Sequence, residues 1–240
     1  MRVSVKVENL GKIFRVYHDR RFKEALVSIF KGRRIYENLV ALKDISLEVG
    51  RGECLGIIGA NGSGKSTLLK LLAGILYPDE GKIAVDGRIS TLIDLESGLH
   101  LDLTGLENIY LNASLFGLTR KEIKERLSDI IEFSELSNFI DTQTRYYSDG
   151  MRARLGFSIA IHVDADVLLI DEVLAVGDLS FKEKCYAMIL EFKKSGRSIV
   201  YVSHDFESIK KVCDKVVWLD KGANRYTGNP EDAVHKYAAM

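Results

Sequence analysis

Residues 59–67 read Gly-Ala-Asn-Gly-Ser-Gly-Lys-Ser-Thr and directly follow the apolar run Cys54–Ile58. A strand, this loop and a helix expected at Thr67–Leu72 form the context in which a glycine-rich loop binds phosphate. Glycines let successive backbone N–H groups turn toward phosphate oxygens, and the helix N-terminus adds positive potential. The stretch predicts a phosphate site made by Gly59, Ala60, Asn61, Gly62, Ser63, Gly64, Lys65, Ser66 and Thr67.

Two side chains of this loop have predicted roles of their own. We expect Lys65 to reach the β- and γ-phosphates of a nucleotide. We expect Ser66 Oγ to ligate Mg²⁺, which prefers hard oxygen ligands and keeps several waters. A glycine-rich turn with a stray lysine is the alternative, and the flanking strand and helix argue against it.

A second apolar run, Val167–Ile170, ends in Asp171 and Glu172. Ligands bind at the carboxyl ends of the strands in a parallel sheet. We expect Asp171 to hold Mg²⁺ through water, and Glu172 to orient and polarise the attacking water in an in-line phosphoryl transfer. Two solvated acids at a strand end would be unremarkable alone, but together with a phosphate loop they predict a catalytic pair.

Two polar turns add to this pattern. Residues 147–151, Tyr-Ser-Asp-Gly-Met, precede a predicted helix, and His204 follows the apolar run 198–202. A Ser-x-Gly turn at a helix N-terminus can grip an anionic γ-phosphate, which assigns Ser148 and Gly150. His204, at a strand tip, can contact the same phosphate. Each would alone be a helix cap or a surface histidine, but their order and spacing favour a nucleotide site.

The composition excludes some classes of protein. The chain has 240 residues, 46% of them hydrophobic, with 34 basic and 34 acidic residues. This zero net charge argues against a general nucleic-acid binder. No apolar stretch approaches the roughly 18–20 residues that span a bilayer, so work at a membrane would require a partner. The N-terminus has no apolar signal region, and the cysteines Cys54, Cys185 and Cys213 fit a reducing compartment.

Strand and helix signals alternate along the chain, with a mostly helical insert from about residue 95 to 160. Helices in the insert are predicted by capping boxes at Thr104-Gly-Leu-Glu107 and Thr119-Arg-Lys-Glu122. The fold class is therefore α/β with a helical subdomain. The predicted strands are Val3–Val7, Ala41–Val49, Cys54–Ile58, Lys82–Val85, Val167–Ile170, Ser198–Val202 and Val216–Leu219.

These motifs resemble the nucleotide-binding subunit of ABC transporters over essentially the whole chain. Residues 59–67 look like Walker A, 147–151 like the signature motif, 167–172 like Walker B, 175–178 like the D-loop, and His204 like the switch histidine. The resemblance implies a P-loop NTPase (RecA-like) core with an N-terminal antiparallel β subdomain. It implies one ABC ATPase domain over 1–240, with the core in 1–94 and 162–240 and the helical subdomain in 95–161.

The resemblance also implies partners and cofactors. ATP and Mg²⁺ are the implied ligands, and hydrolysis is coupled to transmembrane transport. A head-to-tail homodimer is implied, in which Ser148 and Gly150 of one subunit close on ATP held by the other. Two membrane-spanning permease subunits would dock around residues 94–110, at the cytoplasmic face of the membrane. Phe14 falls where the family stacks an aromatic ring on adenine, with Tyr17 as the alternative.

Several departures from the usual family pattern narrow the class. The signature reads Tyr-Ser-Asp-Gly-Met, the D-loop reads Ala-Val-Gly-Asp, and Asp94, or else Glu96, replaces the Q-loop glutamine at the metal. These departures and the Leu-Thr-Gly-Leu-Glu-Asn run at 103–108 are similar to ATPases that export O-antigen, capsule or teichoic acid. The basic amphipathic segment Arg20–Arg34 fits the extra helix of that subfamily near the membrane, although an ordinary surface helix would read alike.

That resemblance implies a lipid-linked polysaccharide as the substrate, reached through the permease. The alternatives are an ABC ATPase of a small-molecule transporter and a soluble ABC ATPase outside transport. A GTPase switch is disfavoured because the chain has no Asn-Lys-x-Asp guanine reader. The carboxylate of Asp149 should repel a γ-phosphate, so we expect it to point away from the nucleotide.

Overall fold

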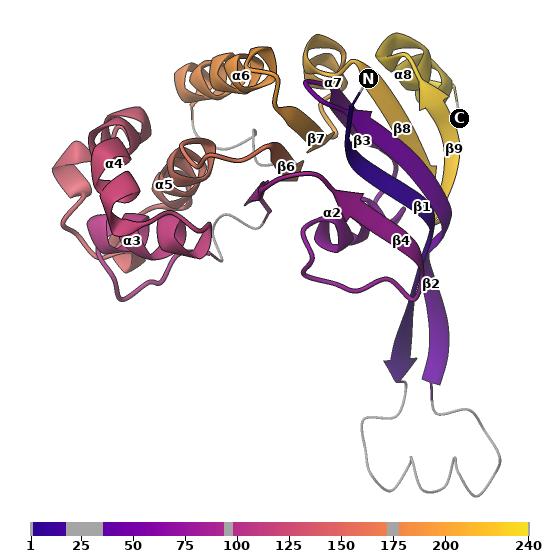
Figure 1. Ribbon diagram of the computed structural model, residues 1–240, viewed down its shortest axis with the longest axis horizontal. Coiled ribbons are helices and arrows are strands. Elements are labelled where there is room, and N and C mark those ends of the chain that lie inside the picture. Colours follow the sequence, from indigo (N-terminus) through magenta and orange to yellow (C-terminus); the bar gives the residue numbers. More distant parts are fainter. Residues whose placement is uncertain (1, 18–35, 94–97, 172–177, 240) are drawn as a thin grey trace, which may run out of the picture.

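The computed structural model describes residues 2–17, 36–93, 98–171 and 178–239, and the architecture below refers to these ranges. Its centre is a six-stranded sheet with the order β5-β6-β7-β3-β8-β9 (Figure 1). The first five strands of this order run parallel, and β9 is antiparallel to β8. The strands are β3 (Cys54–Ile58), β5 (Ile89–Leu92), β6 (Val167–Asp171), β7 (Ser198–Val202), β8 (Lys215–Asp220) and β9 (Ala223–Gly228).

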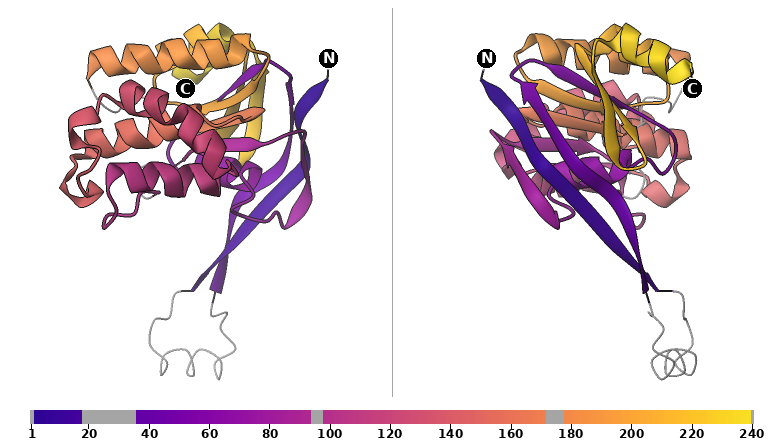
Figure 2. Two further views of the ribbon diagram at one scale, coloured as in Figure 1. Left: turned by 60° about the vertical axis from the view of Figure 1, so that its left-hand side comes forward. Right: turned by 90° about the vertical axis from the view of Figure 1, so that its right-hand side faces the viewer.

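A second, antiparallel sheet has the described order β2-β1-β4, with β1 (Val3–Tyr17), β2 (Tyr36–Gly50) and β4 (Glu80–Val85). The pairing of β1 with β2 continues to Tyr17↔Tyr36, well past the last contact of β1 with β4. The outer halves of β1 and β2 therefore project from the body as a two-stranded ribbon (Figure 2).

Alternating side chains explain how the central sheet is covered on both faces. In β3, Leu55 and Ile57 pack toward the antiparallel sheet and helix α2 (Lys65–Leu72), whereas Cys54 and Ile58 pack on the opposite face. Strands β6, β7 and β8 repeat this alternation. Parallel strands buried on both faces read as continuous apolar runs, which is why the sequence predicted them well.

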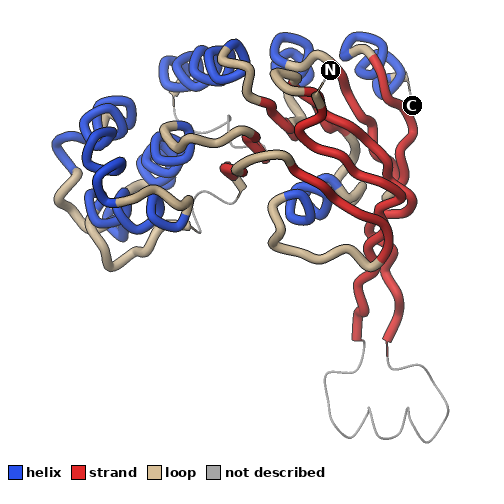
Figure 3. Tube along the Cα trace, in the orientation of Figure 1, coloured by secondary structure: helices blue, strands red, loops and turns tan. Residues whose placement is uncertain are grey.

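Helices cover the second face of the central sheet. They are α6 (Leu179–Lys194), α7 (Phe206–Val212) and α8 (Pro230–Ala238), on the side opposite α2 (Figure 3). Phe157 and Ala160 of α5 (Asp149–Ile161) join the same apolar layer. The sheets and helices confirm the predicted α/β fold class.

A group of helices stands to one side of the sheets, on the left in Figure 1. It consists of α3 (Gly105–Leu115), α4 (Arg120–Ser134), α5, and the 3₁₀ turns η1 (Ser137–Phe139) and η2 (Thr144–Tyr146). These helices share an apolar core of their own. Both predicted capping boxes are present, at Thr104 and Thr119. The division of the chain at residues 94, 95, 161 and 162 stays a prediction, and the segment Arg20–Arg34 lies outside the described residues.

Candidate functional site

The strand register brings the predicted site residues to one edge of the central sheet. Val202, the last residue of β7, pairs with Ile57 of β3 and with Asp171 of β6. The phosphate loop leaves the sheet one residue after Ile58, and His204 follows Val202 by two residues. Because these strands are parallel, the loop, Asp171 and His204 all emerge at their carboxyl ends, where α/β sheets bind ligands.

The phosphate loop encloses the lysine on which its predicted role depends. Lys65 is 6% exposed, and its Nζ donates to the carbonyl oxygens of Gly59 at 2.8 Å and Ala60 at 3.1 Å. These bonds curl the loop over the ammonium group. They hold a positive charge at the N-terminus of α2, where the helix dipole adds to it.

Close packing around the loop explains one of its glycines. Gly64 has φ 105°, and a methyl group there would lie 2.6 Å from Leu42 Cδ2 and 2.7 Å from the carbonyl oxygen of Ala41. The loop is also tied to the β8–β9 turn, because the Gly222 N–H donates to the Ser63 carbonyl at 3.1 Å. Strand β2 and this turn therefore fix the loop from outside.

Ser63 provides a test of whether the loop fits an anionic ligand. Its side chain is 3% exposed, and its Oγ has no hydrogen-bond partner among the described residues. Buried polar atoms are normally satisfied, and an unpartnered one suggests a missing ion or ligand. A hydroxyl donor inside the loop fits a phosphate oxygen. Ala60, Asn61, Gly62 and Ser66 are exposed, so the loop also has an open side.

The acidic residues and the histidine are described only in part. Asp171 is half-buried at the end of β6, and His204 is exposed between Ser203 and the helix α7. Glu172, Asp94 and Glu96 lie outside the described residues, so their predicted roles stay predictions. No group of three or more His, Cys, Asp and Glu residues forms a preformed metal cage within the described ranges. Mg²⁺ in phosphoryl-transfer sites uses few protein ligands, so the pattern Ser66 with Asp171 still fits it.

The signature residues lie apart from the phosphate loop of the same chain. Ser148 is the N-cap of α5, and its Oγ accepts from the Met151 N–H at 3.2 Å. Gly150 lies in the first turn of α5, within the group of helices in Figure 1 rather than beside α2. Asp149 forms an ion pair with Arg152, one turn along the same helix. The structure thus assembles the loop, Asp171 and His204, and leaves Ser148 and Gly150 elsewhere.

Phe14 lies near the phosphate loop through strand pairing. It faces Leu39 of β2, two residues before Ala41, which contacts the position of Gly64. Its ring is half-buried, and Lys12 Nζ lies 5.5 Å from the ring centroid. Tyr17, the alternative, is at the far end of β1, opposite Tyr36. Of the two, Phe14 is nearer to the loop along the strand.

Comparison with known proteins identifies the family. A family model described as ABC transporter matches residues 42–175. The chain belongs to the ABC transporter family. The predicted ABC-type ATPase subunit is therefore confirmed. Within the described residues, no helix has the length and apolar character needed to cross a bilayer.

The relatives of this ABC chain include exporter subunits. It is 46% identical to the O-antigen export system ATP-binding protein RfbB of Klebsiella pneumoniae, over 92% of this chain and 87% of that protein. It is 42% identical to the teichoic acids export ATP-binding protein TagH of Staphylococcus saprophyticus, over 99% of this chain and 89% of that protein. The predicted resemblance to this subfamily is confirmed.

A solved structure with a similar fold is the dimeric, post-hydrolysis state of the ATP-binding cassette MJ0796 bound to ADP and Pi. The TM-score is 0.78 at 21% identity, covering 94% of this chain and 98% of that chain. The likeness supports the cassette fold of the present ABC chain.

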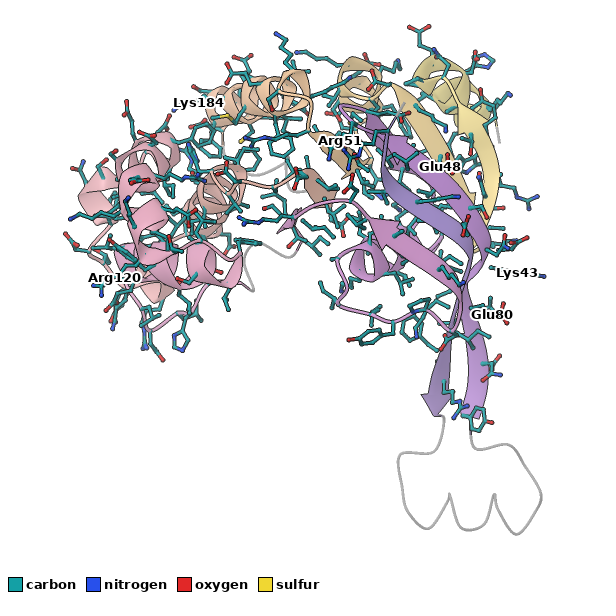
Figure 4. The ribbon with its side chains drawn as sticks, in the orientation of Figure 1. Lys43, Glu48, Arg51, Glu80, Arg120 and Lys184 are labelled. Atoms are coloured by element: carbon teal, nitrogen blue, oxygen red, sulfur yellow. The ribbon has the colours of Figure 1, made fainter. Side chains whose placement is uncertain are left out.

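Sequence reasoning missed an ionic network around Asp178, the one described residue of the predicted D-loop. Arg154 of α5 pairs with Glu135 at 2.7 Å and with Asp178, the N-cap of α6, at 2.8 Å. Lys184, labelled on α6 in Figure 4, pairs with Glu135 at 2.7 Å. The Lys184 hydrogen bond is the main cause that lowers the pKa of Glu135. Only the tertiary fold brings these distant residues together, so no local signal could have found them.

Proposed function

We propose that this chain binds and hydrolyses MgATP to power the export of a lipid-linked polysaccharide through a membrane permease. The observation that carries the ATPase part is the single sheet edge from which the phosphate loop, Asp171 and His204 emerge. Phosphoryl transfer needs positioning and charge stabilisation more than covalent chemistry, and these groups supply both.

The residues of this edge have distinct roles in the proposal. Lys65 releases the carbonyls of Gly59 and Ala60 and turns its ammonium group to the β- and γ-phosphates. Ser66 and Asp171 hold Mg²⁺, with Asp94 as the further proposed ligand. The metal supplies positive charge that offsets the charge developing on the phosphates. Glu172 orients the attacking water, and His204 contacts the γ-phosphate.

A head-to-tail homodimer completes the proposed site. Gly150 lies in open surroundings, because a methyl group there would approach only Ser148 Oγ, at 3.9 Å. Glycine costs a helix roughly 1 kcal/mol relative to alanine, and nothing described inside this chain requires it at this position. Close approach of a second molecule would require glycine here, because a side chain would hold that molecule away. We therefore place Ser148 and Gly150 of one subunit against ATP held by the other.

The permease is proposed to dock beside α3. A cavity of about 110 Å³ lies between β5 and the helices α3 and α5, lined by Thr91, Ile93, Gly98, Leu99, Asn112, Phe116, Gly156 and Ile159. Leu111 and Leu115 of α3, and Leu101 in the segment before α3, expose apolar side chains. Exposed apolar surface beside a concave region is typical of a protein interface. Docking here holds the chain at the cytoplasmic face of the membrane.

The nature of the cargo rests on the relatives. The O-antigen and teichoic acids export proteins match most of this chain at 46% and 42% identity. By their names, the two relatives belong to the export of O-antigen and of teichoic acids. We infer that the present chain serves a cargo of the same class, rather than a small molecule. The basic segment Arg20–Arg34 fits this cargo by its charge and amphipathic pattern.

ATPase assays on the purified chain test the motor. Lys65→Ala should abolish tight MgATP binding, because the loop loses its cation. Glu172→Gln should keep nucleotide affinity, stop hydrolysis and yield a closed dimer in size-exclusion chromatography with MgATP. Turnover by Glu172→Gln at near the wild-type rate would remove Glu172 as the base.

Reconstitution with the permease tests the cargo. The chain should co-purify from detergent with a polytopic membrane protein. In liposomes, a polyprenyl-diphosphate-linked glycan should stimulate its ATPase rate at least about twofold, and unlinked sugars or small apolar drugs should not. Stimulation by a small molecule alone would favour the alternative transporter class. Full activity without a membrane partner, together with failure to co-purify, would favour an ATPase outside transport.

A further inference from the structure

Tyr147, the first residue of the signature segment, is anchored in the interior. Its side chain is 4% exposed, and its hydroxyl donates to the carbonyl oxygen of Phe139 at 2.7 Å. Burial raises the pKa of Tyr147 to about 12, so the phenol stays protonated and remains a donor. The carbonyl oxygen of Tyr147 itself accepts from Arg152 at 2.7 Å. Both ends of this residue are thus fixed, directly before Ser148.

The Tyr147 hydroxyl occupies the space beside Gly105, at the start of α3. A methyl group at Gly105 would lie 2.4 Å from that oxygen, 3.0 Å from the Ile140 carbonyl oxygen and 3.1 Å from Ile140 Cδ1. No carbon of the Tyr147 ring is among these nearest atoms, so the hydroxyl alone makes the severe contact. Gly105 has no positive φ. Its missing side chain is explained by this contact and not by its backbone.

Backbone hydrogen bonds join the two chain segments around this contact. Segment 98–106 leads into α3, and segment 139–147 leads into Ser148. Four bonds connect them: Gly105 N–H to Thr142 O at 3.1 Å, Leu106 N–H to Ile140 O at 2.9 Å, Thr144 N–H to Leu103 O at 2.9 Å, and Arg145 N–H to Leu101 O at 3.0 Å. The buried Asn108 adds a bond from its side chain to Thr144 Oγ1 at 3.3 Å. The two segments are therefore joined by hydrogen bonds on both sides of the Tyr147–Gly105 contact.

We propose that Tyr147 and Gly105 are a matched pair through which the start of α3 sets the position of Ser148. Tyr147 is then a positioning residue for ATP hydrolysis. The inference rests on the proposed function, in which Ser148 closes on nucleotide held by a second subunit. A shift of segment 98–106 reaches Ser148 through the Tyr147 ring and the four backbone bonds. The phosphate loop takes no part in this contact, so nucleotide binding by one subunit is independent of it.

Four variants test the pair: Gly105→Ala, Tyr147→Phe, the double variant, and the matched control Tyr146→Phe, whose ring is 73% exposed. Gly105→Ala should lower kcat about tenfold, because the new methyl group must displace the phenol. Tyr147→Phe should lower kcat about threefold to fivefold, by the loss of one buried hydrogen bond. The double variant should return to within about twofold of Tyr147→Phe, because the contacting oxygen is gone.

Nucleotide binding separates positioning from general damage. The Kd of monomeric protein for MgATP should change by less than about twofold in every variant, while MgATP-driven dimerisation in a Glu172→Gln background follows kcat. Equal losses of monomer binding and kcat would overturn the proposal, as would a double variant no better than Gly105→Ala. If Gly105→Ala does not fold, a double variant that folds supports the pair, and one that also fails to fold refutes it.

The two proposals fail in different ways. A wild-type chain that does not hydrolyse MgATP removes the proposed function. A wild-type chain that hydrolyses MgATP while Tyr147→Phe retains full kcat and dimerisation removes only the matched pair. Tyr146→Phe should stay within about twofold of wild type in both measurements, because its ring is solvated.

Discussion

Replacement of Arg154 by methionine should cost this protein about 2 kcal/mol of unfolding free energy. Arg154 joins three elements at once. Its guanidinium group lies 2.7 Å from Glu135 at the end of α4 and 2.8 Å from Asp178 at the start of α6. The same group lies 4.7 Å from the centroid of the Phe181 ring. Methionine keeps the aliphatic volume and removes only the charge and the donors.

The size of this loss follows from how far each charged side chain is exposed to solvent. The Arg154 side chain is 17% exposed, whereas the carboxylates of Glu135 and Asp178 are 42% and 65% exposed. Exposed ion pairs contribute about 0.2–1 kcal/mol each, and hydrogen bonds to buried charged groups more. The bond to Glu135 therefore contributes about 1.5 kcal/mol, the solvated Asp178 adds little, and the cation–π contact contributes about 0.5–1 kcal/mol. A methionine sulfur over Phe181 recovers part of this, which leaves about 2 kcal/mol.

The stability lost in Arg154→Met should also depend on pH, in a direction that the pKa values of its partners set. The pKa of Glu135 is lowered first by the hydrogen bond from Lys184 and then by the charges of Lys184 and Arg154. A lowered folded-state pKa stabilises the protein above the unfolded pKa, near about 4.3, and this contribution is lost as pH falls through the folded value. The pKa of Asp178 is lowered first by the backbone N–H of Phe181, which the variant keeps. The variant's deficit should thus be largest near pH 7 and shrink toward about pH 3.

Urea unfolding of the chain at pH 7, 5 and 3.5 measures this deficit. For a protein of this length the midpoint of thermal unfolding should fall by about 4–8 °C at pH 7. Arg120→Met is the matched control: Arg120 is exposed at the start of α4 (Figure 4), and its loss should change stability by less than about 0.5 kcal/mol. An Arg154→Met variant as stable as Arg120→Met, or a deficit that stays constant with pH, would refute the reasoning.

Three further predictions follow from the described contacts. Gly64→Ala should lower the free energy of unfolding by about 3 kcal/mol or more and prevent MgATP binding. Gly62→Ala has nothing within 4 Å of the new methyl group, so it should lower the free energy of unfolding by only about 1–2 kcal/mol. Thermal unfolding measures both losses. Asn108→Asp should destabilise by about 3 kcal/mol or more at pH 7, because its buried Nδ2 donates to three carbonyl oxygens that a carboxylate would face, and chemical denaturation measures this. Cys54 and Cys185 should resist iodoacetamide at pH 8 until the chain unfolds, because burial raises the pKa of both thiols, that of Cys185 to about 12. Mass spectrometry of labelled peptides counts the modified sites.

The sequence predicted the elements whose signals are local. Cys54–Ile58 and Val167–Ile170 are continuous apolar runs because both faces of each strand are covered, and the structure places both strands as expected. The capping boxes at Thr104 and Thr119 need only four consecutive residues each, so they too can be predicted from the local sequence alone. The edge at which the phosphate loop, Asp171 and His204 meet follows from parallel strand order.

Elements that depend on distant partners were missed or shortened. Strand β1 was predicted only for Val3–Val7, yet it continues to Tyr17 because β2 supplies hydrogen bonds along its whole length. Beyond the body, Ile13 and Val16 are more than one-third exposed, so no buried face imposes an alternating pattern. Strand β5 at Ile89–Leu92 was missed because its four residues gain their strand form by pairing with β6.

The same distinction between local and distant constraints explains the unusual signature segment. Three positions differ from the Leu-Ser-Gly-Gly-Gln pattern, and each has a partner inside this chain: Tyr147 binds Phe139, Asp149 pairs with Arg152, and Met151 packs against the core of the helical group. The two retained residues are Ser148, which is exposed, and Gly150, where a methyl group would meet only Ser148 Oγ, at 3.9 Å. The three differences thus lie at side chains with partners inside the chain, and the capping hydroxyl and the glycine are what the turn shares with the pattern. The carboxylate of Asp149 is paired with Arg152. The positive charge of Arg152 therefore offsets the repulsion between this carboxylate and a nearby phosphate. The differences from the family pattern at these three positions therefore concern the contacts that fix the turn inside the chain. Ser148 and Gly150, which we propose to contact the phosphate, match the pattern.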